Sequence, residues 1–378
     1  MEISEIPTPS YVLEEKKLRQ NLEILKRVSD ESGLNILMAL KGFAFWNSFP
    51  LVKQYLSGTS ASGLHEALLG FEEFGDEVHT YSPAFNPNEI EKIAEISTKI
   101  IFNSFSQLQK HYDFVKSKNP NISIGLRLNP EFSTTKVDLY NPCSPFSRLG
   151  VVKSEFEKNI GNWIERIDGF HFHALCEQGI EDLVPLYREF ESKFGNWFDK
   201  IEWINMGGGH LITRKNYDVE NLISFVKEIK NERPHLQFYI EPSEAIGWET
   251  GFLISEVLDI VENGIKIAIL DASAEAHMPD VLAMPYRPNV ENDIKNGEFH
   301  YRFAGNSCLA GDIIGDYYFK NELQIGDKIF FKDMIHYTIV KNTTFNGLPL
   351  PSLYKIKESG EIAKIKQFSY QNYKERLS

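Results

Sequence analysis

Short β-type runs alternate with helical stretches through the first two thirds of the chain, and this alternation limits the possible folds more than any other feature. The β-type runs lie at 34–40, 58–62, 77–82, 99–104, 122–129, 169–175, 201–208 and 237–245. Between them stand amphipathic stretches such as DVENLISFVKEIK, each long enough for a crossover helix. Eight such βα units predict an α/β protein with a (β/α)8 barrel, in which functional side chains gather at the carboxyl ends of the strands.

The character of the sequence changes after residue 250. The segments that follow are rich in β formers and are separated by Gly, Asn and Asp turns; they include FLISEVLDIVENGIKIAIL, GDKIFFKDMIHYTIVKN and LPSLYKIK. The segment PTPSYVL, which precedes the first helical stretch, is also strand-like and could join the same sheet. We therefore expect a barrel domain over residues 14–250 and a β domain built from residues 1–13 and 251–378.

Composition excludes several classes of function. The 378 residues carry a formal net charge of −13, which disfavours nucleic-acid binding and is compatible with a cationic substrate. No apolar run could span a membrane, and the N-terminus lacks a secretory or transit pattern, so we expect a cytoplasmic protein without a membrane partner. The three cysteines, Cys143, Cys176 and Cys308, lack metal-ligand spacing; we expect free thiols and no metal site.

Lys41 stands directly after the first apolar run, in ALKGFA, where its ammonium would emerge at the catalytic rim of the barrel. Low-dielectric surroundings would lower the pKa of its amine and make it a nucleophile toward an aldehyde. An ordinary lysine at the end of a strand would instead be solvated and inert. The residue alone leaves both interpretations open.

Three further features would lie at the same rim. The seventh run leads into Gly207, Gly208 and Gly209, whose backbone amides could bind a phosphate or could simply form a tight turn. Glu241 ends the eighth strand, in EPSEA, and could keep a pyridine nitrogen protonated, or could pair with a neighbouring cation. His173, in HFHAL, could face a flat ring or could be a hydrogen-bonded core residue.

Two residues of the expected β domain are also candidates. Cys308 lies in GNSCLAGD, among small residues that would let a loop approach another surface closely. Its thiol could return a proton to a carbanion, or could be a buried apolar filler. Tyr337, in MIHYTIVKNTTFNG, could offer its hydroxyl to a phosphate or complete the core of the β domain.

Six motifs follow one another along nearly the whole chain: ALKGFA, HFHAL, NMGGGH, EPSEA, CLAGD and HYTIVKNTTFNG. In this order and at these separations they resemble the fold-type III decarboxylases, which include ornithine, arginine and diaminopimelate decarboxylases. The resemblance implies pyridoxal 5'-phosphate as cofactor. It also implies an alanine racemase-like N-terminal barrel, a C-terminal β-sandwich or β-barrel domain, and a homodimer whose two active sites are shared across the interface.

The resemblance also implies a role for each matching position. The cofactor would be held by Lys41 as the Schiff-base lysine, His173 as the ring-stacking histidine, Gly207, Gly208 and Gly209 as the phosphate loop, Glu241 as the partner of the pyridine nitrogen, and Tyr337 as a phosphate contact. Cys308 matches the cysteine that the family donates across the dimer interface to protonate the decarboxylated intermediate. The catalytic residues would therefore be Lys41 and Cys308.

Two positions depart from the ornithine and diaminopimelate decarboxylases. Glu244 stands where those enzymes have a phosphate-binding arginine, and Leu309 stands where they have an acid that touches the far end of the substrate. Both departures, together with AEAHMPDVLAMPYRP (274–288), resemble the carboxynorspermidine decarboxylase branch of the family. This resemblance implies decarboxylation of carboxynorspermidine or carboxyspermidine to norspermidine or spermidine, in polyamine biosynthesis.

A substrate of this kind carries two cationic amines, so its pocket should present carboxylates at two distances from the cofactor. We consider Glu244 first, and then Asp280 and Asp312, for both of which a solvated surface acid is the default interpretation. The turn-rich segment 131–148 could be a lid or a static loop. Three alternatives stay open: a decarboxylase of diaminopimelate, ornithine or lysine, a racemase on the same barrel, or a cofactor-binding homologue without activity.

Overall fold

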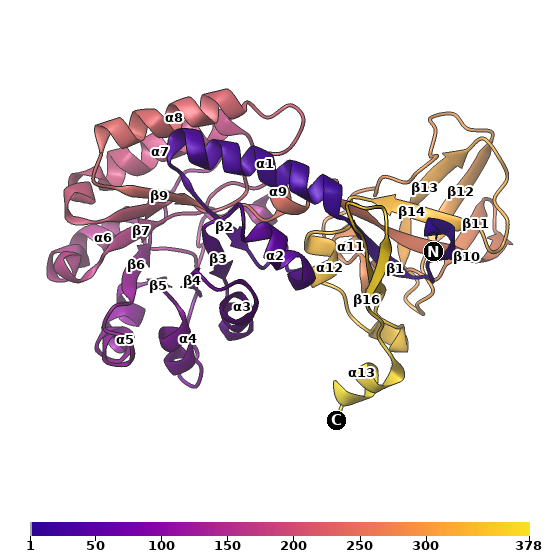
Figure 1. The fold of residues 1–378 in the computed structure, drawn as a ribbon, viewed down its shortest axis with the longest axis horizontal. Coiled ribbons are helices and arrows are strands. Elements are labelled where there is room, and N and C mark those ends of the chain that lie inside the picture. Colours follow the sequence, from indigo (N-terminus) through magenta and orange to yellow (C-terminus); the bar gives the residue numbers. More distant parts are fainter. Residues whose placement is uncertain (1) are drawn as a thin grey trace. The chain divides into compact units, whose positions relative to one another are not determined.

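The chain forms two compact units in the computed structural model, which describes residues 2–378. The barrel unit runs from Asn21 to Ile246 and contains a closed eight-stranded barrel. The sheet unit combines the residues up to Gln20 with Gly247–Ser378 and contains a separate mixed sheet. Figure 1 shows the first unit in indigo to salmon, and most of the second in orange to yellow.

Eight parallel strands close the barrel, because each pairs with the next along the chain and β2 also pairs with β9. The strands are β2 (Asn35–Ala39), β3 (Gly58–Ala61), β4 (Glu77–Tyr81), β5 (Lys99–Phe102), β6 (Ser123–Arg127), β7 (Gly169–His171), β8 (Trp203–Asn205) and β9 (Gln237–Ile240). Each lies inside one of the eight predicted runs, so the predicted barrel is confirmed.

Helices lie outside the ring of strands (Figure 1). Those that begin before or within the barrel unit are α1 (Glu15–Ser32), α2 (Phe49–Val52), α3 (Leu64–Leu69), α4 (Ile90–Ile96), α5 (Phe105–Lys118), α6 (Lys153–Asn159), α7 (Ile180–Phe194), α8 (Val219–Glu232) and α9 (Glu244–Gly247). In α8, the Asp218 side chain caps the first turn by accepting a hydrogen bond from the Asn221 N–H. The buried residues Leu222, Val226 and Ile229 recur at helical spacing, which turns one apolar face inward.

Large side chains fill the barrel interior, so there is no open channel through it. One buried cluster consists of Leu37, Ile101, Trp203 and Tyr239. A Cβ atom at Gly125 or Gly169 would lie 2.5 or 2.0 Å from the Trp203 ring. Strands β6 and β7 therefore need glycine at these positions to make room for the indole.

The sheet unit is a mixed sheet in the order β13-β12-β11-β10-β1-β15-β16, with β14 paired to β10. Its strands are β1 (Ser10–Glu14), β10 (Gly251–Glu262), β11 (Lys266–Leu270), β12 (Phe299–Ala304), β13 (Ile313–Phe319), β14 (Lys328–Lys332), β15 (Ser352–Ile356) and β16 (Ile362–Lys366). Strand β1 is antiparallel to β10 and parallel to β15. The N-terminal strand thus completes a sheet whose other strands come from the last third of the chain.

Short helices interrupt the sheet unit: α10 (Ala274–His277), α11 (Asp280–Ala283), α12 (Tyr337–Val340) and α13 (Tyr370–Glu375). The predicted β character of the whole segment GDKIFFKDMIHYTIVKN was wrong in its second half. Strand β14 ends at Lys332, Asp333 adopts a left-handed φ of 62°, and the chain then turns into α12. Among residues 2–378, no helix combines the length and apolar character that a membrane span requires.

Candidate active site

A cavity of about 630 Å³ opens at the carboxyl ends of the barrel strands. Residues from six strand ends line it: Lys41 after β2, Ser60 and Ala61 on β3, Tyr81 on β4, Arg127 on β6, His171 and His173 on and after β7, and Glu241 after β9. The loop between β6 and α6 supplies most of the remaining wall. The structure thus brings three of the predicted site residues, Lys41, His173 and Glu241, to one cavity.

Lys41 projects into this cavity from the end of β2. Part of Lys41 is open to the solvent of the cavity, but many protein atoms surround its amine. This burial removes water from the amine and lowers its pKa. The positive charge of Arg127 lowers that pKa further, whereas the carboxylates of Glu241 and Glu66 oppose the change. The Lys41 amine is therefore neutral at a lower pH than that of an ordinary lysine, and it can act as a nucleophile.

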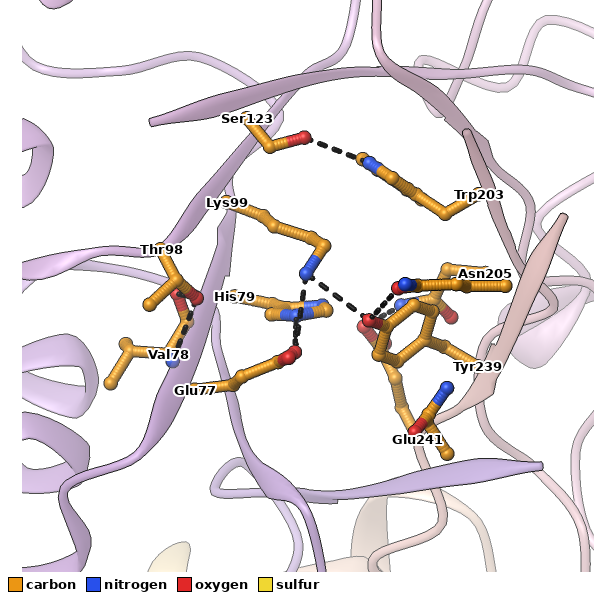
Figure 2. Close-up of polar contacts among 12 residues, drawn as sticks. Glu77, Val78, His79, Thr98, Lys99, Ser123, Trp203, Asn205, Tyr239 and Glu241 are labelled. Atoms are coloured by element: carbon orange, nitrogen blue, oxygen red, sulfur yellow. Dashed lines mark hydrogen bonds and ion pairs between the residues drawn. The ribbon is translucent and has the colours of Figure 1, made fainter. Parts of the chain in front are cut away.

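Glu241 is held as a carboxylate by its neighbours. The Asn205 side-chain amide donates a hydrogen bond to Glu241 Oε1 at 2.7 Å (Figure 2). His171 Nε2 lies 3.5 Å from Glu241 Oε2. Burial raises the pKa of Glu241, but the hydrogen bond with His171 and the nearby positive charges outweigh it and lower this pKa to about 2. An anion is thus fixed at this point of the cavity wall at neutral pH.

The glycine triplet packs closely against the neighbouring strand ends. A Cβ atom on Gly207, Gly208 or Gly209 would lie within 2.5 Å of a backbone carbonyl oxygen. Gly207 and Gly209 also have positive φ angles of 72° and 89°. The Gly207 N–H donates to Asn205 Oδ1 at 2.9 Å, so one buried amide side chain holds both this loop and Glu241. Residues other than glycine could not adopt this backbone path at Gly207–Gly209 without clashes.

His173 presents a neutral ring to the cavity. Its Nδ1 accepts a hydrogen bond from the Gly208 N–H at 2.9 Å, which places the ring proton on Nε2. Burial lowers the pKa of His173 well below its usual value, and the charges of Lys41 and Arg127 act in the same direction. The planar His173 ring is therefore uncharged and is hydrogen-bonded to the glycine loop.

Sequence reasoning missed four residues of the site: Tyr81, Arg127, His171 and Asn205. Each is the last residue of its strand, on β4, β6, β7 and β8 respectively. The Arg127 guanidinium lies 4.6 Å from the Tyr81 ring centre and donates to the His173 carbonyl oxygen at 3.2 Å. The signal that could have found them is a polar or aromatic residue at the end of each predicted strand.

A second polar cluster lies deeper in the barrel (Figure 2). Glu77 begins β4 and Lys99 begins β5, and their side chains form an ion pair with 3.2 Å between Nζ and Oε2. The same Glu77 oxygen lies 2.7 Å from His79 Nε2, and Lys99 donates to the Tyr239 hydroxyl at 3.2 Å. Glu77, Lys99 and Tyr239 thus pair with one another inside the barrel, whereas His79 Nδ1 is buried without a hydrogen-bond partner among the described residues.

The three acids that were expected to bind substrate do not line the cavity. Glu244 begins α9 and is half-buried. Asp280 accepts hydrogen bonds from the Lys341 ammonium at 2.6 and 2.9 Å. Asp312 is buried and accepts from the Ala274 N–H at 2.7 Å and from two serine hydroxyls. Asp280 and Asp312 are thus engaged in contacts within the sheet unit.

Cys308 and Tyr337 both belong to the sheet unit. Cys308 is exposed on the loop between β12 and β13, and its backbone N–H donates to Asn346 Oδ1 at 2.7 Å. The neighbouring Ser307 hydroxyl donates to Asp312, which fixes the other side of this loop. Tyr337 is half-buried at the first position of α12, and the Lys341 Nζ lies 5.5 Å from its ring centre.

A parallel barrel with a polar cavity at its strand ends, joined to a mixed sheet, is the architecture of a barrel enzyme, and a match to a known family makes it a pyridoxal-dependent one. Residues 11–335 match the family described as pyridoxal-dependent decarboxylase, C-terminal sheet domain. The chain belongs to this family of decarboxylases, whose cofactor is pyridoxal phosphate.

Full-length relatives narrow the comparison. The chain is 48% identical to a carboxynorspermidine/carboxyspermidine decarboxylase of Campylobacter jejuni, over 97% of this chain and 98% of the relative. It is 44% identical to a carboxyaminopropylagmatine decarboxylase of Synechocystis, over 99% and 96% of the two chains. A crystal structure of carboxynorspermidine decarboxylase from C. jejuni, complexed with norspermidine, has a TM-score of 0.90 and 47% identity and covers 98% of this chain and 100% of its own.

Proposed function

We propose that this protein decarboxylates carboxynorspermidine, carboxyspermidine or both, and releases CO2 with norspermidine or spermidine in polyamine biosynthesis. The observation that carries this proposal is the 48% identity to the C. jejuni enzyme over nearly the full length of both chains. A second enzyme of that name, from Herminiimonas arsenicoxydans, is 37% identical over 99% of this chain.

The residues at the cavity fit pyridoxal phosphate. Glu241 supplies a carboxylate for a protonated pyridine nitrogen. The phosphate role of the glycine loop stays a prediction from the resemblance, since the Gly207 and Gly208 N–H groups already donate to Asn205 and His173. When bound, the cofactor supplies a conjugated ring that accepts the electrons left behind by the departing CO2. Lys41 would hold it through an amine whose pKa is already lowered, and the neutral ring of His173 would lie against its face.

Proton return is assigned to the sheet unit of a second copy. Cys308 presents an exposed thiol on a loop that Asn346 and Ser307 hold from two sides, so Cys308 Sγ can deliver a proton to a site outside its own unit. This assignment requires a homodimer with shared active sites, and Tyr337 would add a phosphate contact. We propose a cytoplasmic location for this dimer, because the pathway uses small soluble metabolites.

Carboxyaminopropylagmatine is the second candidate substrate. The Synechocystis relative that is named for it is 44% identical, only a little below the C. jejuni enzyme. The agmatine part ends in a planar guanidinium, whereas the carboxylated polyamines end in an ammonium. The two classes of substrate share the reacting centre and differ in the cationic group at the far end. Comparing their rates therefore reports on the part of the pocket that binds this far end.

A substrate panel decides between these functions. CO2 release by the cofactor-loaded protein would be measured on carboxynorspermidine, carboxyspermidine, carboxyaminopropylagmatine, ornithine, lysine and diaminopimelate, with Lys41→Ala as the inactive control. We expect the highest kcat/KM on the first two compounds. A preference for carboxyaminopropylagmatine or for a simple diamino acid would keep the chemistry and overturn the substrate, and no release from any compound would overturn the enzymatic function.

A further inference from the structure

The loop between β6 and α6 is held over the cavity by contacts at both of its ends. Near its start, the Ser133 hydroxyl donates to the Ala174 carbonyl oxygen at 2.7 Å, and the Thr135 hydroxyl donates to Gln178 Oε1 at 3.0 Å. Near its end, the Asn103 amide donates to the Arg148 carbonyl oxygen at 2.8 Å. These contacts hold the two ends of the loop, and most of residues 138–147 between them line the cavity.

Asp138 lies in this middle part, is exposed to solvent, and lines the cavity. Among the described residues that form the cavity wall, the carboxylates are Asp138 and Glu241, whereas the cations are Lys41, Arg127 and Arg148. Glu241 is hydrogen-bonded to Asn205 and lies at the position assigned to the pyridine nitrogen. Asp138 is thus the cavity carboxylate that is left for a cation of the substrate.

The neighbours of Asp138 suit the rest of a polyamine tail. Leu139 and Phe146 line the same wall, and both are largely exposed to solvent. Burying such apolar surface against a methylene chain is favourable, at about 25 cal/mol per Å². A tail that alternates amines with short methylene segments would meet a carboxylate and apolar surface on one loop.

We propose that Asp138 binds an amine of the substrate tail and so contributes to substrate specificity. This inference rests on the proposed function and deepens it, because it assigns the tail to a loop of the barrel unit. Glu244, Asp280 and Asp312 are outside the cavity wall formed by the described residues and need not take this role.

The test compares two variants that remove one negative charge from the same loop. Asp138→Asn removes the cavity carboxylate, whereas Glu131→Gln removes an exposed carboxylate that is not part of the cavity wall among the described residues. Norspermidine binding to the holoenzyme would be measured by calorimetry, together with KM and kcat on carboxynorspermidine. We expect Asp138→Asn to weaken norspermidine binding and raise KM by roughly 10- to 100-fold, the range for a hydrogen bond to a charged group.

The controls distinguish a failure of the Asp138 proposal from a failure of the proposed decarboxylase function. Glu131→Gln should change both quantities less than about twofold, Asp138→Glu should recover most of the binding, and cofactor affinity should be the same in all variants. If the wild type binds norspermidine and Asp138→Asn binds it equally well, or no worse than Glu131→Gln, the inference fails and the proposed function stands. If the wild type neither binds norspermidine nor acts on carboxynorspermidine, both fail.

Discussion

The barrel unit and the sheet unit each bury a carboxylate, but in opposite settings. Glu241 faces the cavity, where one amide and one imidazole hold it and solvent or a ligand can reach it. Asp312 is 2% exposed and is surrounded by donors from Ser273, Ala274 and Ser307. The first acid keeps capacity for a ligand, whereas the second joins two segments of its own unit. A buried acid therefore indicates a binding site only where a cavity reaches it.

The largest effect that this comparison predicts is on activity when Glu241 is neutralised. Glu241→Gln removes the anion at the cavity, and we expect kcat to fall roughly 10²- to 10³-fold, as when one preorganised electrostatic group is removed from an active site. Steady-state CO2 release by the cofactor-loaded variant measures this. A variant that kept more than a tenth of the wild-type kcat would contradict the proposed functional role of Glu241 and its contrast with Asp312.

The corresponding substitution in the sheet unit, Asp312→Asn, should affect stability instead of activity. Asp312→Asn replaces one accepting oxygen with an NH2 group, which faces the donors from Ser273, Ala274 and Ser307. Some of these buried donors then lack an acceptor, which should lower the free energy of unfolding by about 2 kcal/mol. Thermal and denaturant unfolding of the apoprotein measure this, while cofactor titration should give an unchanged Kd because the barrel cavity is untouched. A large loss of cofactor affinity with no loss of stability would contradict this part of the account.

A smaller effect should follow from removing Asn205, which is fully buried at the end of β8. Asn205→Ala takes one donor from Glu241 and one acceptor from the Gly207 N–H, so both contacts to the cofactor should loosen together. We expect cofactor affinity to fall by about tenfold, the value of one lost hydrogen bond to a charged group. Equal affinity in both proteins would show that Asn205 is only a filler of the barrel.

The smallest effect concerns pH. The pKa of Glu241 is about 2 in the folded protein, below the ordinary value of 4.5. A lowered pKa stabilises the fold above the ordinary value, and this contribution is lost as the pH falls from about 4.5 toward 2. Unfolding of the apoprotein across the acid range should therefore depend less steeply on pH in Glu241→Gln than in the wild type. Identical slopes would contradict the assigned state of this carboxylate.

The sequence predicted the barrel because each of its strands leaves a local signal, a short β-type run bounded by turns. It also predicted which motifs would meet, since Lys41, Gly207 and Glu241 each stand within or just after a run whose position in the barrel follows from its order. All three reach the same strand-end rim in the structure.

The remaining residues of the site depend on contacts that sequence order does not carry. Arg127 and His171 end their strands, but what makes them part of the site is the ring or carboxylate that lies opposite in the closed barrel. Asp312 could not be separated from a substrate ligand, because its partner Ser273 lies 39 positions away in the chain. The tertiary fold decides these pairings.

The most direct measurement of the central claim is to locate the cofactor on the chain. The pyridoxal-phosphate-loaded protein would be reduced with borohydride, digested and mapped by mass spectrometry, with Lys41→Ala treated in the same way. The account predicts a pyridoxyl-phosphate mass on the peptide that carries Lys41, and none on that peptide in the variant. Label on a different lysine, or a wild-type protein that takes up no label, would contradict the assignment of this cavity as the active site.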